Sequence, residues 1–182
     1  MHPVELCRAL RQVFAQHPEA TLVCDGGEIG QWPQAMLTPA RRVINGPAGS
    51  IGSSIPMAIA ARATAPDSPV IAVMGDGTFG FHMAEFDTAV RCNLPFVAVV
   101  GNDATWNAEH QIQLRAYGPE RAIGTDLLAS RYDDVSRGFG GFGECVTVPR
   151  DLLAAARRGL VSGLPAVLNV AIEGRAAPQV KK

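Results

Sequence analysis

The stretch VIAVMGDGTFG, residues 70–80, joins an unbroken apolar run to a turn that contains three glycines and one acid. The run over 70–74 is apolar at every position, which predicts a β-strand covered on both faces, as in parallel sheets. The turn over 75–80 ends this strand, and a helix is expected from about His82 to Cys92. Strand, glycine-rich turn and helix in this order are typical of a crossover unit whose turn faces a ligand.

The same alternation of strand and helix patterns continues on both sides of this stretch. Strands separated by helices predict parallel crossovers, and hence an α/β fold with a three-layer, doubly wound, mostly parallel sheet. We expect one domain over residues 1–174 and a flexible tail over 175–182, with a long polar segment from 101 to about 125. Further strands are expected at 21–24, 42–44, 96–100, 145–148 and 166–171, and helices at about 4–16, 55–64, 132–139 and 151–161.

Composition places the chain among ordinary globular proteins and argues against two broad classes. Of its 182 residues, 47% are hydrophobic, and 16 basic residues stand against 17 acidic ones, so there is no broad basic field for nucleic acid. No apolar run approaches the roughly 20 residues that span a bilayer, and no secretory signal begins the chain. The 4 cysteines and 4 histidines are scattered. This predicts reduced thiols in a cytoplasmic protein and gives no support for zinc.

The turn over 75–80 also matches the dinucleotide fingerprint G-x-G-x-x-G, and Asp103 lies about 20 residues further on. An NAD-binding Rossmann domain is therefore one interpretation. Asp76 argues against it, because a carboxylate inside the turn repels a pyrophosphate by about 1 kcal/mol or more at contact range. A divalent cation between the two groups reverses the sign. Mg²⁺ accepts this arrangement, since it binds a few protein oxygens together with phosphate oxygens and water.

A metal site needs a second oxygen ligand, and Asn102 is placed to supply one. It follows the strand over 96–100, so it is expected at the same edge of the sheet as Asp76. Its amide oxygen can coordinate a cation without adding charge. The alternatives are that Asn102 and Asp103 cap a loop, and that Asp76 is a helix cap or a turn residue.

These features resemble the cofactor motif of thiamine diphosphate enzymes, in which G-D-G is followed by an asparagine. Here 24 residues separate Gly77 from Asn102. The chain is similar to the C-terminal, diphosphate-binding domain of the acetolactate synthase, benzoylformate decarboxylase and oxalyl-CoA decarboxylase group. The resemblance extends over nearly the whole chain and includes 25–27 with Trp32, 49–56, 93–95, 139–143 and 163–166.

The resemblance implies a Mg²⁺ site in which each ligand has a position in this sequence. Asp76 and Asn102 would coordinate the metal through their side chains, and Ala104 through its backbone carbonyl. The family often has two asparagines in succession, whereas the second position here is Asp103. Its carboxylate either stays outside the metal sphere or shifts the metal preference.

The resemblance also implies which residues contact thiamine diphosphate. Ile51 would wedge the cofactor into its bent V shape, whereas composition alone predicts ordinary packing for this side chain. The Gly49 carbonyl would accept a hydrogen bond from the pyrimidine 4′-amino group, and Gly77 and Thr78 would donate to the diphosphate. The expected cofactor-binding positions are Gly49, Ile51, Gly52, Gly75, Gly77 and Thr78.

Three further polar side chains lie close to these motifs in the sequence. Glu109 and His110 occupy a segment where the family places residues that cover cofactor or substrate, so they are candidate acid/base groups. A solvated helix face is the alternative for both. His82 follows the diphosphate turn and either approaches the site or lies on the helix surface.

The same resemblance implies that the chain is catalytically incomplete. In this family the glutamate that activates the cofactor belongs to a pyrimidine-binding domain, and 182 residues hold only one of the two domains. We therefore expect a thiamine diphosphate-dependent 2-oxo acid decarboxylase or carboligase that needs a partner domain or subunit, in a homo- or hetero-oligomer. Its substrate would be a small 2-oxo acid or an acyl-CoA derivative. The alternatives are the NAD-binding oxidoreductase and a non-catalytic domain that keeps the fold.

Overall fold

In a computed structural model of the chain, which describes residues 1–46 and 48–178, the strands form one six-stranded sheet. Its order is β2-β1-β3-β4-β6-β5, and every neighbouring pair is parallel. The predicted α/β fold is confirmed, and the sheet is parallel throughout. The strands are β1 (Thr21–Cys24), β2 (Arg41–Ile44), β3 (Val70–Gly75), β4 (Val97–Asn102), β5 (Phe142–Val146) and β6 (Ala166–Ala171).

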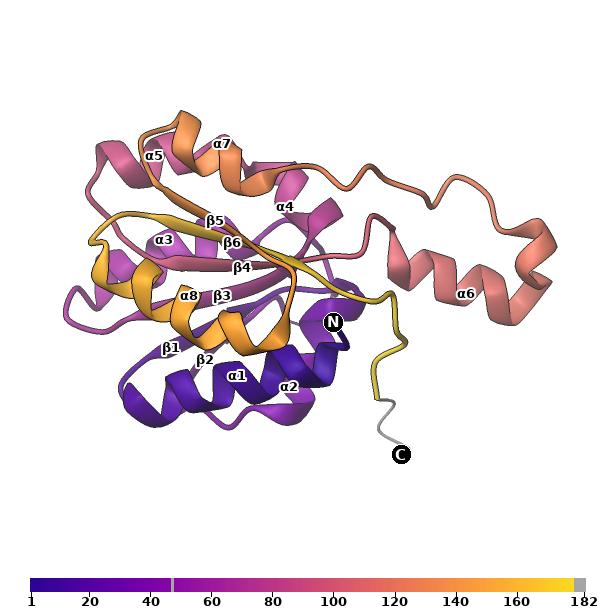
Figure 1. Cartoon of the computed structure of the whole chain (residues 1–182), viewed down its shortest axis with the longest axis horizontal. Coiled ribbons are helices and arrows are strands. Elements are labelled where there is room, and N and C mark those ends of the chain that lie inside the picture. Colours follow the sequence, from indigo (N-terminus) through magenta and orange to yellow (C-terminus); the bar gives the residue numbers. More distant parts are fainter. Residues whose placement is uncertain (47, 179–182) are drawn as a thin grey trace.

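Helices cover both faces of the sheet and complete three layers (Figure 1). One face carries α1 (Pro3–Gln16), α2 (Gly27–Met36) and α8 (Pro149–Val161). The other face carries α3 (Ser54–Thr64), α4 (Asp76–His82), α5 (Glu85–Arg91) and α7 (Tyr132–Gly138). The helix α6 (Asn107–Tyr117) and the 3₁₀ turn η1 (Pro119–Arg121) belong to residues 103–131, which project from the body as an arm (Figure 1).

The central strands are buried on both faces because their residues are apolar at successive positions. Val73 and Val99 pack under α1, α2 and α8, whereas their neighbours Ala72 and Val100 pack under α3, α4 and α5. Burying a side chain of this size contributes about 1.5–3 kcal/mol. The strand β2 is an edge strand with mostly exposed residues, so the expectation of two covered faces does not extend to it.

The order of the strands places a ligand crevice between β1 and β3. These strands are neighbours, but the chain leaves β1 toward β2 at one edge and then continues from β3 toward β4 on the other side. In open parallel sheets, ligands bind outside the carboxyl ends of the strands at such a switch point. Here, Asp25 follows β1 and Asp76 follows β3.

Two predicted element bounds differ from the structure by three residues. The helix expected over 82–92 is α5, which begins at Glu85, and a separate helix, α4, occupies the predicted turn and begins directly after β3 at Asp76. The buried Phe79 anchors α4 although glycines surround it in sequence. The strand expected over 145–148 is β5, which ends at Val146. Val148 instead serves as the N-cap of α8.

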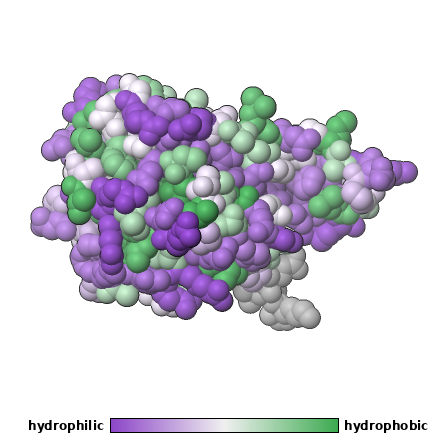
Figure 2. Space-filling model, viewed as in Figure 1, coloured by the Kyte–Doolittle hydropathy of each residue, from purple (hydrophilic) through white to green (hydrophobic). Residues whose placement is uncertain are grey.

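Two further helices were not expected, α2 at the crevice and α6 within the arm. In α2, Ile29 and Trp32 are buried and hold a segment that also contains glycines and Pro33. In the polar segment, α6 exposes Ile112, and the arm also exposes Ile123 and Leu128. Figure 2 shows a visible face that is largely hydrophilic, with hydrophobic residues on the body and on this arm.

The chain beyond residue 174 starts against α2. The carbonyl of Arg175 accepts hydrogen bonds from Trp32 Nε1 at 3.5 Å and from Asn107 Nδ2 at 3.4 Å, and Ala177 is buried. The domain boundary at 174 and the flexible tail over 175–182 stay predictions, and residues 179–182 lie outside the described part of the chain. Within the described part, no helix is both long enough and apolar enough to cross a membrane.

Candidate functional site

A cleft of about 230 Å³ opens at the carboxyl ends of the central strands, where the fold places its ligand crevice. The start of α2 forms one wall, and the beginning of the arm forms another. Most of the cofactor-binding positions predicted from the sequence line this cleft, namely Gly49, Ile51, Gly75, Gly77 and Thr78, together with the predicted metal ligand Asp76. Gly52 does not line it and lies against Phe81 and His82.

Asp76 is the least satisfied polar group of this cleft. The residue is only 2% exposed, and its Oδ1 accepts a hydrogen bond from the Gly77 backbone N–H at 2.8 Å. Its Oδ2 is buried without a hydrogen-bond partner. Burial raises the pKa of Asp76, and hydrogen bonds from backbone N–H groups oppose that change. A buried carboxylate with an unpaired oxygen is costly, which suggests a missing positive partner.

A second carboxylate, from Asp103, lines the same cleft. Burial, and after it the neighbouring charge of Asp76, raise the pKa of Asp103 to about 7. Two neighbouring carboxylates repel each other when both are ionised, and a divalent cation between them removes this repulsion. No group of three or more His, Cys, Asp and Glu side chains converges among the described residues. The protein therefore offers this Asp76–Asp103 pair, which suits Mg²⁺ bound together with phosphate.

Asn102 and Ala104, the other two predicted metal ligands, do not line the cleft. The Asn102 amide donates to the Ser130 carbonyl at 3.0 Å and to Asn169 Oδ1 at 3.1 Å, and its Oδ1 accepts from the Ala104 N–H at 3.2 Å. The Ala104 carbonyl accepts from the Leu127 N–H at 2.7 Å. Both residues line a neighbouring cavity of about 280 Å³.

Asp103 lies between the two openings and lines both of them. It shares the cleft with Asp76 and the neighbouring cavity with Asn102 and Ala104. The Ala104 N–H, which donates to Asn102 Oδ1, is also among the backbone groups that lower the pKa of Asp76. The structure thus adds Asp103 to the groups beside Asp76, and the ligand roles of Asn102 and Ala104 stay predictions.

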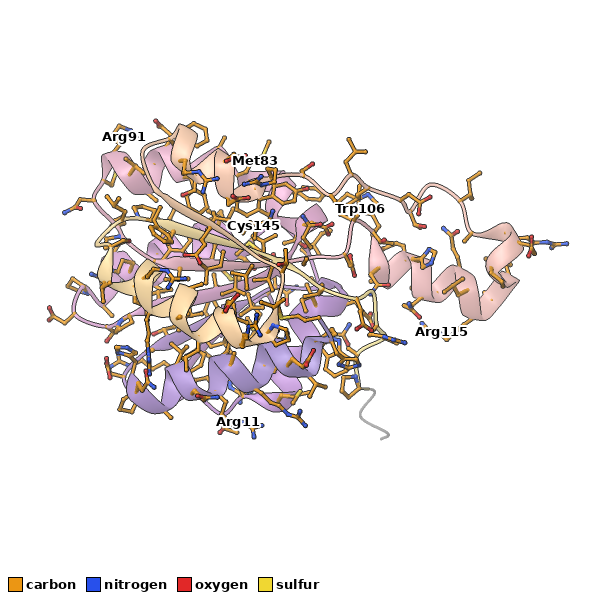
Figure 3. The ribbon with its side chains drawn as sticks, in the orientation of Figure 1. Arg11, Met83, Arg91, Trp106, Arg115 and Cys145 are labelled. Atoms are coloured by element: carbon orange, nitrogen blue, oxygen red, sulfur yellow. The ribbon has the colours of Figure 1, made fainter. Side chains whose placement is uncertain are left out.

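Trp106, at the start of the arm, covers the glycine-rich segment over 75–80. A Cβ atom on Gly77 would lie 2.4 Å from the Trp106 ring, so only glycine fits beneath the indole. The ring also meets Phe81 edge-on, with centroids 5.9 Å apart. Figure 3 shows Trp106 where the arm leaves the body of the molecule. The indole therefore links the arm to α4 at the rim of the cleft.

The three polar candidates from the sequence have different surroundings. Glu109 lines the cleft from α6. His110 is held through its Nδ1 by Thr125 Oγ1 at 2.8 Å, within the arm. His82 reaches the carbonyl of Gly52 with its Nδ1 at 2.7 Å, so it contacts the loop that carries Ile51 instead of lying free on the helix surface.

Sequence reasoning missed the contribution of α2 to this cleft. Gly27, Glu28 and Ile29 line it, and Ile29 packs so closely on Gly101 that a Cβ there would lie 2.7 Å from its side chain. The available signal was the D-G-G segment after β1, which the resemblance included without a role. The buried residues Cys7 and Cys24 do not line the cleft. Burial raises the pKa of both thiols to about 12.

Comparison with known proteins agrees with this geometry. Residues 25–170 match the family model described as "Thiamine pyrophosphate enzyme, C-terminal TPP binding domain". The chain is 37% identical over 174 residues to the acetolactate synthase large subunit IlvG of Mycobacterium tuberculosis, covering 93% of this chain and 31% of that protein. It is 30% identical over 180 residues to 2-hydroxyacyl-CoA lyase 2 of Caenorhabditis elegans, covering 92% of this chain and 28% of the relative.

A solved structure shares the fold at lower sequence identity. The thiamine diphosphate-dependent 4-hydroxybenzoylformate decarboxylase of Rhodococcus jostii RHA1 superposes with a TM-score of 0.83 at 20% identity, over 95% of this chain and 32% of that one. The chain thus spans about a third of the length of the proteins that it matches.

Proposed function

Since the chain belongs to the thiamine pyrophosphate enzymes, as their C-terminal TPP binding domain, we propose that its cleft binds the diphosphate of thiamine diphosphate through Mg²⁺. The observation that carries the metal is the buried Asp76 Oδ2, which has no partner in a cleft that it shares with Asp103. Both carboxylates would ligate the cation. The ligand roles of Asn102 and Ala104 stay predictions, since Asn102 Oδ1 and the Ala104 carbonyl each accept one hydrogen bond and keep a second lone pair.

The residues around the Asp76–Asp103 pair fit the rest of the cofactor. Gly77 and Thr78 line the cleft beside Asp76 and would contact the diphosphate, with Gly75 leaving room behind them. Gly49 and Ile51 line the cleft opposite and would hold the pyrimidine and the bend of the cofactor, with Gly52 supporting the loop. Two carboxylates carry two negative charges, which one Mg²⁺ neutralises before the diphosphate arrives.

We further propose that the whole protein is an acetolactate synthase-like decarboxylase or carboligase. The two named relatives, an acetolactate synthase and a 2-hydroxyacyl-CoA lyase, support a small 2-oxo acid or a 2-hydroxyacyl-CoA as substrate. Thiamine diphosphate supplies a nucleophilic carbon and an electron sink for such reactions. The residues of this chain bind and orient it. A pyrimidine-binding domain or subunit would supply the activating glutamate, in a homo- or hetero-oligomer.

No observation favours the NAD-binding alternative. The turn over 75–80 has the spacing of the fingerprint, but the unpaired carboxylate of Asp76 lies where the fingerprint requires an uncharged approach to the pyrophosphate. An NAD site would therefore bind best without metal and would improve when Asp76 is replaced.

Fluorescence of Trp106 tests the proposal on the purified chain. The chain has 2 tryptophans, and the other, Trp32 of α2, is 7% exposed and packs against His2. We expect thiamine diphosphate to change the emission in the presence of Mg²⁺ and to leave the emission unchanged when EDTA removes the metal. The Trp106→Phe variant is the control that assigns the signal. A change on adding NAD without metal would contradict the proposal.

A further inference from the structure

Asp25 is a buried carboxylate that holds the loop next to the cleft. It follows β1, is 0% exposed, and accepts hydrogen bonds through Oδ2 from the Gly52 N–H at 2.9 Å and the Ser54 N–H at 3.1 Å. No basic side chain lies within ion-pair distance of it among the described residues. A buried charge without a counter-charge is costly. Two hydrogen bonds to one loop compensate Oδ2, whereas Oδ1 is buried without a partner among the described residues.

His82 holds the same loop from the opposite direction. Its Nδ1 lies 2.7 Å from the Gly52 carbonyl oxygen, and because a carbonyl only accepts, the proton is on Nδ1. The backbone N–H of Gly52 is therefore bound by the end of β1, and its C=O by the end of α4. One residue next to Ile51 is fixed by two elements that are far apart in the sequence.

Close packing around Gly26 and Gly52 leaves this loop little freedom. A Cβ on Gly52 would lie 3.0 Å from Phe81 Cβ, and the φ of Gly52 is +95°, which favours glycine. A Cβ on Gly26 would lie 2.6 Å from the Gly49 carbonyl oxygen and 3.0 Å from Ile51 Cγ2. The position of the two cleft residues Gly49 and Ile51 is thus set by contacts with the segment after β1 and with α4.

We propose that Asp25 and His82 are positioning residues for thiamine diphosphate, which fix the Gly52 backbone and so hold Gly49 and Ile51 at the cleft. The inference rests on the proposed function and extends it. It also couples the two ends of α4, since this helix begins with Asp76 of the metal pair and ends with His82. The diphosphate side and the pyrimidine side of the cleft are then spaced by one short helix.

The positioning role differs from a purely structural one in what it changes. Asp25 also accepts from the first residue of α3, whose N-cap Ser53 makes no side-chain bond, so removing Asp25 destabilises the helix as well. His82 is exposed, so we expect its loss to have little effect on folding. His82 is therefore the sharper test, and Asn is its conservative replacement, because the Asn amide can donate the same hydrogen bond.

The experiment compares the full chain with its His82→Ala, His82→Asn and Asp25→Asn variants, with His17→Ala as the control at the other end of the sheet. Dissociation constants are measured at saturating Mg²⁺ for thiamine diphosphate and for inorganic pyrophosphate. We expect His82→Ala to weaken thiamine diphosphate about tenfold while pyrophosphate changes less than twofold. His82→Asn should restore most of the affinity. Asp25→Asn should weaken thiamine diphosphate in the same way and lower the melting temperature.

Amide hydrogen exchange of residues 49–54 in the cofactor-free chain tests the hydrogen bonds themselves. We expect at least tenfold faster exchange in His82→Ala and unchanged exchange in His17→Ala. Unchanged exchange, or an equal loss of affinity for both ligands, would overturn the positioning role. Wild-type chain that exchanges as expected but binds no thiamine diphosphate would contradict the proposed function instead, and with it the assignment of the loop to that cofactor.

Discussion

Two groups of acids, one around the buried Asp133 and the other around the buried Asp76, differ in how they are paired. Asp133 is 0% exposed, and its carboxylate accepts from Arg131 Nη2 at 2.8 Å and Arg137 Nη2 at 2.7 Å. Burial alone would raise the pKa of Asp133, but these hydrogen bonds outweigh it and lower the pKa to about 2. Asp76 and Asp103 have no basic partner among the described residues, and their pKa values are raised.

The difference separates a structural acid from one available to a ligand. The Asp133 cluster is satisfied within the chain and joins the arm and α7 to β6 through Asn169. In the Asp76–Asp103 pair, Asp76 Oδ2 has no hydrogen-bond partner among the described residues. This oxygen is therefore free to accept a bond from a ligand or a cation. Similar burial with opposite pairing therefore predicts opposite responses to substitution.

The largest effect is expected at the unpaired acid. Asp76→Asn removes the charge of the more deeply buried ligand, whose Oδ2 has no partner within the described residues, so the affinity for thiamine diphosphate in Mg²⁺ should fall at least a thousandfold, about 4 kcal/mol. The metal-free variant should be as stable as the wild type or more stable, because a buried charge has been removed. Titration calorimetry and thermal melting measure the two quantities. A weaker metal-free fold would show that Asp76 is a structural acid like Asp133.

The matched substitution in the paired cluster should do the reverse. Asp133→Asn removes the buried carboxylate and leaves Arg131 and Arg137 with the exposed Asp134 as their acidic partner, so the free energy of unfolding should fall by about 2 kcal/mol. For a domain of this size, the melting temperature should fall by about 4–8 °C. Affinity for thiamine diphosphate should stay within threefold of the wild type. Loss of affinity at full folding would remove the distinction between the two groups.

The choice between the neighbouring residues Asp103 and Asn102 gives a smaller effect. Asp103→Asn keeps an oxygen ligand but removes its charge, so Mg²⁺ affinity should fall about tenfold, which corresponds to about 1.4 kcal/mol. Asn102→Ala should change Mg²⁺ affinity less than threefold, although it loses the hydrogen bonds to Ser130 and Asn169. The reverse order would restore Asn102 as the ligand, as the resemblance implied.

The dependence of stability on pH should have opposite signs for the two groups. The folded pKa of Asp103, about 7, lies above the usual value of 3.8, so the metal-free chain should lose stability as the pH rises from about 4 to 7. The folded pKa of Asp133 lies below 3.8, so its contribution should be lost as the pH falls from about 4 to 2. Each slope is at most about 1.4 kcal/mol per pH unit for one group. Denaturant titrations should also show that Mg²⁺ abolishes the Asp103 slope, and an unchanged slope would argue against a metal there.

Strands were predictable where burial leaves a simple pattern. The strands over 21–24 and 166–171 were predicted with the bounds that the structure has, because each is apolar at nearly every position in a covered sheet. The edge strand β5 is only partly buried, so its start at Phe142 lacks such a run. In α2, glycines and Pro33 oppose a helix, and only tertiary packing explains it, since a Cβ on Gly30 would lie 2.3 Å from the Asp25 carbonyl oxygen.

The candidate site was predictable in its location and only partly in its residues. The G-D-G turn identified Asp76 and the strand end that faces it. The sequence left open whether Asp103 stays outside the metal sphere, and only the structure shows that it lines the cleft with Asp76. The sequence does not show the role of Asp25 and His82, because it depends on the path of the loop between β2 and α3. This loop brings Gly52 to Asp25, which is 27 residues before it, and to His82, which is 30 residues after it.

The central claim is that thiamine diphosphate binds through Mg²⁺ at the unpaired carboxylate of Asp76. We would titrate thiamine diphosphate into the chain by calorimetry, with Mg²⁺ and with EDTA, for the wild type, Asp76→Asn and Asp133→Asn. We expect thiamine diphosphate to bind the wild type and Asp133→Asn in the presence of Mg²⁺. We expect no binding in EDTA and none to Asp76→Asn. Equal binding by the wild type in EDTA, or undiminished binding by Asp76→Asn, would contradict it.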